Sequence, residues 1–235
     1  MAKSNSWRQF KAILRKDLVM ELRTKEMITS MGLYALLTMV VYQIALAEAG
    51  DSFDVRLVMP GLIWVAFIFM SMLGLNRSFV HEKDQGCIDA LLLSPVDRPV
   101  IFFAKFAGNL LFLMVVELLS LPVFSFLFLQ GRVGFGNPVW LIGVVLLGAS
   151  IGISGVGTLL ATMTVNTKGK DVMLAVLFVP IMYPLLRAAV GATFAAVIGG
   201  PGTVTTFWLY MAWVAAFDVI MVAIAYALYE FVIGV

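Results

Sequence analysis

The sequence predicts an all-α polytopic membrane protein in which six transmembrane helices follow an N-terminal amphipathic interfacial helix. Of the 235 residues, 62% are hydrophobic and 13% are charged, whereas soluble domains usually carry about 25% charged residues. A chain of this size cannot hide so large an apolar excess in a soluble core. Six apolar stretches are each long enough to cross a bilayer, which takes about 20 residues. Lipid is therefore the expected solvent.

The six expected spans are continuous apolar segments, without the alternating pattern of membrane β-barrel strands. We place them at residues 27–47, 57–75, 100–129, 138–165, 172–190 and 206–233. The third, fourth and sixth are long enough that they should tilt, kink or extend past the hydrocarbon. Because proline removes a helical hydrogen bond, kinks are expected at four positions. These positions are Pro60, Pro122, Pro180 and Pro184.

Residues 1–26 are expected to form a cytoplasmic elbow helix ahead of a transmembrane domain at residues 27–235. One face of this helix is apolar and consists of Trp7, Phe10, Leu14, Leu18 and Leu22. An adjacent face is basic, with Arg8, Arg15, Lys16 and Arg23, and Lys11 interrupts the apolar one. A basic amphipathic helix of this kind lies in the plane of the lipid headgroups. The alternative is a basic tail that only directs topology and whose periodicity is incidental.

The distribution of lysine and arginine predicts the orientation, because cytoplasmic segments carry an excess of both. Thirteen of the sixteen basic residues belong to the N-terminal segment or to the loops after the second and fourth spans. Both termini are therefore expected in the cytoplasm. The opposite side has only Arg56, Arg132 and Arg187. An aromatic belt is expected near the outer ends of the spans, from Trp64, Trp140 and Trp208.

The loop at residues 76–99 is the longest on the expected cytoplasmic side. Its residues 87–93 form a short apolar helix candidate, preceded by Gly86 and ended by Ser94 and Pro95. Three consecutive leucines in a cytoplasmic loop are costly if they remain in water. One interpretation is a docking helix for a cytosolic partner. The other is packing against the inner ends of the protein's own helices.

Two carboxylates, Glu117 and Asp218, fall near the middle of expected spans. A charge at this depth costs about 2.5–3.5 kcal/mol on insertion scales, so such a group faces a cavity or a partner, or is protonated. No lysine or arginine is expected deep in any span to pair with either of them. They are therefore candidates for a substrate or proton path. The alternative is a structural hydrogen bond between helices.

Glycine and serine gather between Gly143 and Gly157, where small side chains permit close approach of helices. Within this stretch, residues 152–155 read Gly-Ile-Ser-Gly, which matches the G-x-S-G motif of intramembrane serine proteases. That chemistry needs a base beside the serine, but the only histidine, His81, belongs to the cytoplasmic loop. Helix packing is the favoured interpretation, and no catalytic residue is assigned.

Several classes of site and partner are disfavoured. The chain has no G-x-x-x-x-G-K-[ST] sequence with which to hold ATP in a P-loop. A single histidine does not provide bis-histidine haem ligation, and a single cysteine provides neither a disulfide nor a thiolate metal cluster. We therefore expect no metal site and no cofactor on this chain. The net charge of +2 is too small to indicate a nucleic-acid partner.

The order of these features resembles the membrane subunit of type-2 ABC transporters, and more specifically the haem exporter protein B (CcmB) family of the cytochrome c maturation system. A Pro-Gly-Leu-Ile-Trp-Val-Ala block at residues 60–66 opens the second span as in that family. In the inner loop the resemblance is carried by Phe79, Asp84, Gly86, the Leu-Leu-Leu-Ser-Pro block at residues 91–95 and Lys105. In the fifth-span region it is carried by residues 164–165, Lys168, residues 179–180 and residues 184–186.

The resemblance implies a permease subunit in a bacterial inner membrane, beside a separate cytosolic ATPase, the A subunit, which holds the ATP. It also implies a haem-handling C subunit and a haem chaperone, the E subunit, with haem as a possible substrate of the complex. Whether haem crosses the membrane or ATP drives release of haem-loaded chaperone stays open. The ATPase-coupling residues would be Phe79, Glu82, Asp84, Gly86, Cys87, Leu91, Leu92, Leu93, Ser94 and Pro95. The rivals are a type-2 permease for a drug, lipid or polysaccharide, and a membrane scaffold that translocates nothing.

Overall fold

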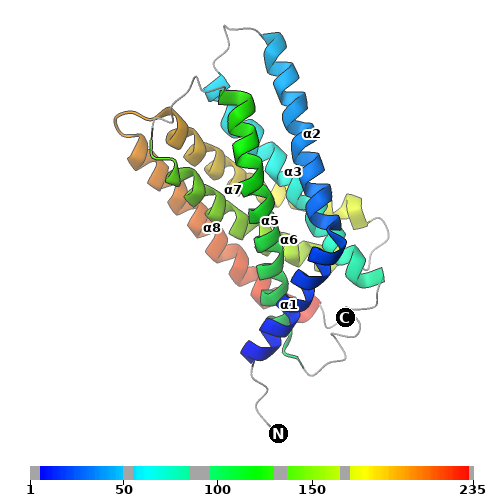
Figure 1. The fold of residues 1–235 in the computed structure, drawn as a ribbon. Helices are drawn as coiled ribbons and strands as arrows, with labels where there is room; N and C mark the ends of the chain where they lie inside the picture. Colours follow the sequence, from blue (N-terminus) through cyan, green and yellow to red (C-terminus); the bar gives the residue numbers. More distant parts are fainter. Residues whose placement is uncertain (1–5, 50–54, 85–95, 130–136, 165–169, 233–235) are drawn as a thin grey trace.

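The computed structural model describes residues 6–49, 55–84, 96–129, 137–164 and 170–232. These residues form an all-helical bundle (Figure 1), in which six helices are long and apolar enough to cross a membrane. The elements are α1 (Ser6–Thr24), α2 (Glu26–Ala49), α3 (Val55–Asp84), α5 (Arg98–Leu129), α6 (Trp140–Thr164), α7 (Lys170–Ile198) and α8 (Thr203–Val232). The predicted fold class is confirmed: the protein is a multi-pass membrane protein with an N-terminal helix ahead of its six candidate spans.

Helix α6 lies at the centre of the bundle and is buried over most of its length. It contacts α3, α5, α7 and α8, whereas α2 packs on the outside against α3 and α5. The glycines of α6 permit this central position, because side chains of its neighbours occupy the space that a Cβ would need. At Gly157 that neighbour is Leu75 of α3, and at Gly148 it is Val214 of α8. The small-residue stretch therefore packs helices closely, as its composition predicts.

Helix α7 extends eight residues beyond the expected end of the fifth span, from residue 190 to Ile198. Gly191 lies inside the helix, where the Tyr210 ring occupies the space that a Cβ would need. The helix ends instead at a Gly-Gly-Pro-Gly turn, residues 199–202, whose three glycines all have positive φ. Glycine adopts this left-handed backbone without steric cost and commonly ends helices.

Helices run through all four prolines at which kinks are expected, at Pro60 in α3, Pro122 in α5, and Pro180 and Pro184 in α7. The aromatic belt needs a correction at Trp64. Trp140 and Trp208 are exposed and their ring centroids lie 6.4 Å apart. Trp64 is only 1% exposed, and its indole N–H donates to Thr193 Oγ1 at 2.9 Å. Thr193 of α7 satisfies the one polar atom of this ring, so the ring is stable in the core rather than at the membrane surface.

Figure 1 shows α1 meeting α2 at a bend, at the end of the bundle where α3 ends, α5 begins and α8 ends. Because six is an even number of crossings, α1 and the end of α8 share one side. The connection between α7 and α8 lies at the opposite end. The chain therefore leaves α3 at Asp84 and enters α5 at Arg98 on the same side as α1. The expected loop at residues 76–99 is shorter than predicted, because its first nine residues, 76–84, belong to α3.

Candidate functional site

Glu117 is buried between α5 and α6 and is 1% exposed. Ser150 Oγ of α6 donates a hydrogen bond of 2.6 Å to its Oε2 atom, while Oε1 has no hydrogen-bond partner among the described residues. This contact is the structural hydrogen bond between helices that the sequence leaves open as the alternative. The Oε1 atom of Glu117 accepts no hydrogen bond from the described residues. A carboxylate that exchanges a proton or contacts a substrate needs such an oxygen.

The contact of Glu117 belongs to a line of polar contacts between α5 and α6. Ser150, Ser154 and Thr158 recur every four residues, so they share one face of α6. Ser154 Oγ donates to the Phe106 carbonyl at 2.9 Å, and Asn109 Nδ2 donates to Thr158 Oγ1 at 2.9 Å. The serine of the G-x-S-G motif thus holds two helices together, which agrees with the preference for packing over protease chemistry.

Asp218 of α8 lies against α6 at Gly152 and is 8% exposed. A Cβ at residue 152 would overlap Asp218 Oδ1 and would lie 2.8 Å from Leu185 Cδ2. Glycine at 152 therefore makes room for this carboxylate, whose Oδ1 has no hydrogen-bond partner among the described residues. A groove of about 530 Å³ opens beside Asp218, and its other lining residues are all apolar or aromatic and come from α5, α6 and α8.

The two carboxylates do not meet. Glu117 contacts Ser150 and Asp218 contacts Gly152, and positions two apart on a helix point about 200° away from each other. The side chains therefore lie on opposite sides of α6, one against α5 and one against α8. A single path within this chain that passes both groups would have to cross the central helix.

Arg187 is expected near the outer end of the fifth span, because the predicted span ends only three residues after it. The structure continues α7 for eleven residues beyond Arg187, a rise of about 16 Å. Arg187 therefore lies farther from the end of the helix than the predicted span places it, inside the candidate span Val172–Ile198. The side chain is exposed on the bundle and lies over the Tyr210 ring, with Cζ 5.8 Å from the ring centroid.

Part of the predicted coupling segment can be placed. Phe79, Glu82 and Asp84 belong to the end of α3, although their side chains are not described. Gly86, Cys87, Leu91, Leu92, Leu93, Ser94 and Pro95 lie outside the described residues. The short apolar helix expected at residues 87–93 stays a prediction.

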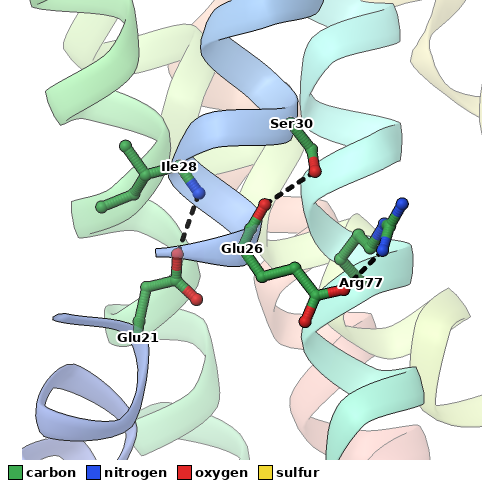
Figure 2. Close-up of polar contacts among 5 residues, drawn as sticks. All are labelled: Glu21, Glu26, Ile28, Ser30 and Arg77. Carbon is green, nitrogen blue, oxygen red and sulfur yellow. Dashed lines mark hydrogen bonds and ion pairs between the residues drawn. The ribbon is translucent and has the colours of Figure 1, made fainter. Parts of the chain in front are cut away.

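Ion pairs fasten α1 and α2 to both helices that flank this segment, a feature that sequence reasoning did not find. On one side Lys105 of α5 donates to Asp17 of α1, with Nζ 2.9 Å from Oδ2, and the two side chains are 4% and 11% exposed. On the other side Glu26, the first residue of α2, pairs with Arg77 of α3, as Figure 2 shows. Spacing along the chain could not reveal either pair, because the partners are 88 and 51 residues apart.

The bend between α1 and α2 is built from a single residue. Lys25 has a left-handed backbone with φ of 54°, which is uncommon for a residue other than glycine. Glu21 Oε1 accepts the Ile28 N–H at 2.9 Å (Figure 2), so the last turn of α1 caps the first turn of α2. The two helices are therefore joined by a short capped link that fixes where one leads into the other.

No group of three or more histidine, cysteine, aspartate or glutamate side chains that could hold a metal ion occurs in the described ranges. The described residues offer structural polar contacts, two carboxylates that each have an oxygen without a hydrogen-bond partner among these residues, and an anchored N-terminal helix.

Comparison with known proteins agrees with this architecture. The chain is similar to heme exporter protein B of Pseudomonas aeruginosa, with 29% identity over 167 residues, or 70% of this chain and 72% of the relative. It is similar to the protein of the same name from Haemophilus influenzae, with 26% identity over 75% of this chain and 77% of the relative. For the Bradyrhizobium diazoefficiens protein the identity is 24%, over 80% of this chain and 82% of the relative. The family described as CcmB protein matches residues 8–230, nearly the whole chain, and the chain therefore belongs to the CcmB family.

Proposed function

We propose that this protein is the transmembrane permease subunit of an ABC transporter for cytochrome c biogenesis. The observation that carries the proposal is the family match over residues 8–230 of a six-span bundle. In this bundle α5 and α3, the helices on either side of the coupling segment, are tied to α1 and α2 by ion pairs. The relatives' name, heme exporter protein B, makes haem the expected substrate of the complex. The subunit itself performs no ATP hydrolysis, since its sequence has no P-loop.

In this proposal the free energy comes from a cytosolic ATPase, the A subunit. Closure of two ATPase subunits on ATP pushes the segment at residues 87–93, which is continuous with α3 and α5 through short connections. The Lys105–Asp17 pair transmits the displacement from α5 to α1, and the Arg77–Glu26 pair transmits it from α3 to α2. The elbow helix therefore moves together with the coupling segment. Rigid helices that have two packed arrangements can convert such a push into a change on the far side of the membrane.

The remaining partners follow from the same assignment. A haem-handling C subunit and the E-subunit chaperone act beside this chain in a bacterial inner membrane, with both termini of this chain in the cytoplasm. The excess of lysine and arginine on the side of α1 supports that orientation. The separation of Glu117 and Asp218 by α6 favours two sites of action over one continuous path through the subunit.

Charges placed in the coupling segment test the link to the ATPase. We expect Leu91→Asp combined with Leu92→Asp to abolish most co-purification of the ATPase, because carboxylates cannot enter an apolar docking surface without a large desolvation cost. Leu91→Met with Leu92→Met is the matched control, since it keeps the apolar character and should keep the complex. The docking role is wrong if the aspartate variant retains normal association and normal cytochrome c maturation.

Isosteric amides test the two carboxylates. We expect Glu117→Gln and Asp218→Asn each to reduce cytochrome c maturation severely while the chain still accumulates in the membrane, because each amide keeps the shape and removes the ionisable group. Glu48→Gln, at the exposed end of α2, is the control and should leave maturation unchanged. Full maturation in both buried variants would assign Glu117 and Asp218 to purely structural contacts.

A further inference from the structure

The outward face of α1 differs in charge from its inward face. Four basic side chains are exposed on it and form no salt bridge within the described part of the chain. We call these four residues the cationic face: Arg8, Lys11, Arg15 and Arg23. At about 100° per residue they occupy less than half of the helix circumference. The helix therefore presents a compact group of four positive charges.

Both acidic residues of α1 are held on the opposite side. Asp17 pairs with Lys105 and with Lys16, whose Nζ lies 3.0 Å from Oδ1. Glu21 is occupied in capping α2 through the Ile28 N–H. Neither carboxylate is available to neutralise the cationic face, so this face attracts anions.

Apolar side chains are exposed among the same charges. Trp7 is 60% exposed and Leu22 63% exposed, and Val19 is exposed as well. Trp7 and Leu22 belong to the apolar face that the amphipathic pattern predicts. Phe10 and Leu14 of the same face, together with Ile13, turn towards the bundle. Lys11 Nζ lies 5.2 Å from the centroid of the Trp7 ring, so charge and aromatic surface are interleaved. Water solvates such apolar groups poorly, whereas the headgroup layer accommodates both kinds of side chain.

The position of the face along the chain places it at that layer. Only Lys25 separates α1 from Glu26, where the first candidate span begins. The capping contact of Glu21 and the ion pair of Asp17 hold α1 against the bundle with its outward face fixed. Basic groups at the edge of a span attract anionic lipids, and each lysine or arginine adds to this attraction.

We propose that the cationic face of α1 is a binding surface for the phosphate headgroups of anionic phospholipids. The inference does not depend on the transport assignment, because it rests only on the charge, exposure and position of α1. The occupant is the bilayer itself rather than a protein, since the exposed Trp7, Val19 and Leu22 match the boundary between headgroups and acyl chains.

The test uses the full chain purified in a neutral detergent and titrated with phosphatidylglycerol or with phosphatidylcholine of the same acyl chains. The readout is the midpoint of thermal unfolding, followed by circular dichroism. We expect phosphatidylglycerol to raise the midpoint at much lower concentration than phosphatidylcholine. Combining Arg8→Gln, Lys11→Gln, Arg15→Gln and Arg23→Gln should weaken the apparent affinity for phosphatidylglycerol by at least about tenfold.

Two controls make the outcome decisive. The combination Arg8→Lys, Arg15→Lys and Arg23→Lys keeps the charge and should keep the response to phosphatidylglycerol. The glutamine variant should unfold at the same temperature as the parent when no lipid is added, because the changed side chains point away from the bundle. Equal responses to the two lipids, or an unchanged response in the glutamine variant, overturn the proposal. It is also overturned if the glutamine variant keeps its lipid response but loses a protein partner that co-purifies with the parent.

Discussion

Gly152→Ala should destabilise the protein by about 1–3 kcal/mol, a typical cost of adding a methyl group to a packed core. The new Cβ would overlap Asp218 Oδ1 and would press on Leu185 Cδ2 at 2.8 Å. Neither neighbour can move away easily, because Asp218 has a short side chain and Leu185 is 1% exposed. The midpoint of thermal unfolding in detergent and the amount of chain in the membrane should both fall.

Gly143→Ala is the matched control on the same helix. Nothing lies within 4 Å of a Cβ at residue 143, and alanine is the better helix former of the two residues. This variant should be as stable as the parent or slightly more stable. If Gly152→Ala and Gly143→Ala have the same midpoint of thermal unfolding, then α8 does not pack closely against α6 at Gly152.

A second change separates the packing of Asp218 from its charge. Asp218→Ala removes the carboxylate that the Gly152→Ala methyl group overlaps, so the double variant should be more stable than the sum of the two single effects predicts. Residues in direct contact commonly show such coupling, whereas distant residues behave additively. Additive effects would mean that the cost of Gly152→Ala arises entirely from Leu185.

The fold could be predicted largely from the sequence because each span is indicated by a local run of apolar residues. A run of apolar residues about as long as the bilayer is thick is sufficient to indicate a crossing, and all six were expected. The largest boundary errors concern α3, which continues nine residues beyond the expected end at residue 75, and α7, which continues eight residues beyond residue 190 and past Gly191. The actual role of Gly191 depends on the Tyr210 ring of the next helix, which packs against it. A local signal cannot report that contact.

The site was less predictable, because its geometry depends on which helix faces which. Depth alone nominated Glu117 and Asp218 correctly as buried carboxylates. Ser150 donates a hydrogen bond to Glu117, and Gly152 makes room for Asp218. Both contacts depend on the central position of α6, which the periodicity of the sequence does not reveal. The pairing of Asp17 with Lys105 was hidden for the same reason.

Lys105→Met should destabilise the protein by about 3 kcal/mol, the lower end of the cost of removing one partner from a buried ion pair. Lys105 is 4% exposed, and its loss takes this cation away from Asp17, whose side chain is 11% exposed. The docking of α1 on α5 should loosen first, because Ile13 of α1 and Phe102 of α5 share the small apolar cluster beside this pair. Hydrogen exchange of the α1 amides should therefore rise before the rest of the bundle is affected.

The matched surface control is Arg77→Met, since the Glu26–Arg77 pair has side chains that are 47% and 54% exposed. Exposed ion pairs contribute about 0–1 kcal/mol, so this variant should remain close to the parent in stability. Asp17→Asn should also destabilise the protein, because it leaves the Lys105 ammonium, which is 4% exposed, without this carboxylate.

Exchanging the two charges decides whether the pair itself anchors α1. Asp17→Lys and Lys105→Asp should each loosen α1, and the double variant should recover much of the protection if the two side chains meet as in the structure. The exchange also places a second lysine beside Lys16, so recovery should be partial and should improve as salt screens that repulsion. If the α1 amides of the double variant are no better protected than those of the worse single variant, Lys105 stabilises α5 without holding α1. The Asp17–Lys105 contact then cannot transmit a displacement of the inner loop to the elbow helix.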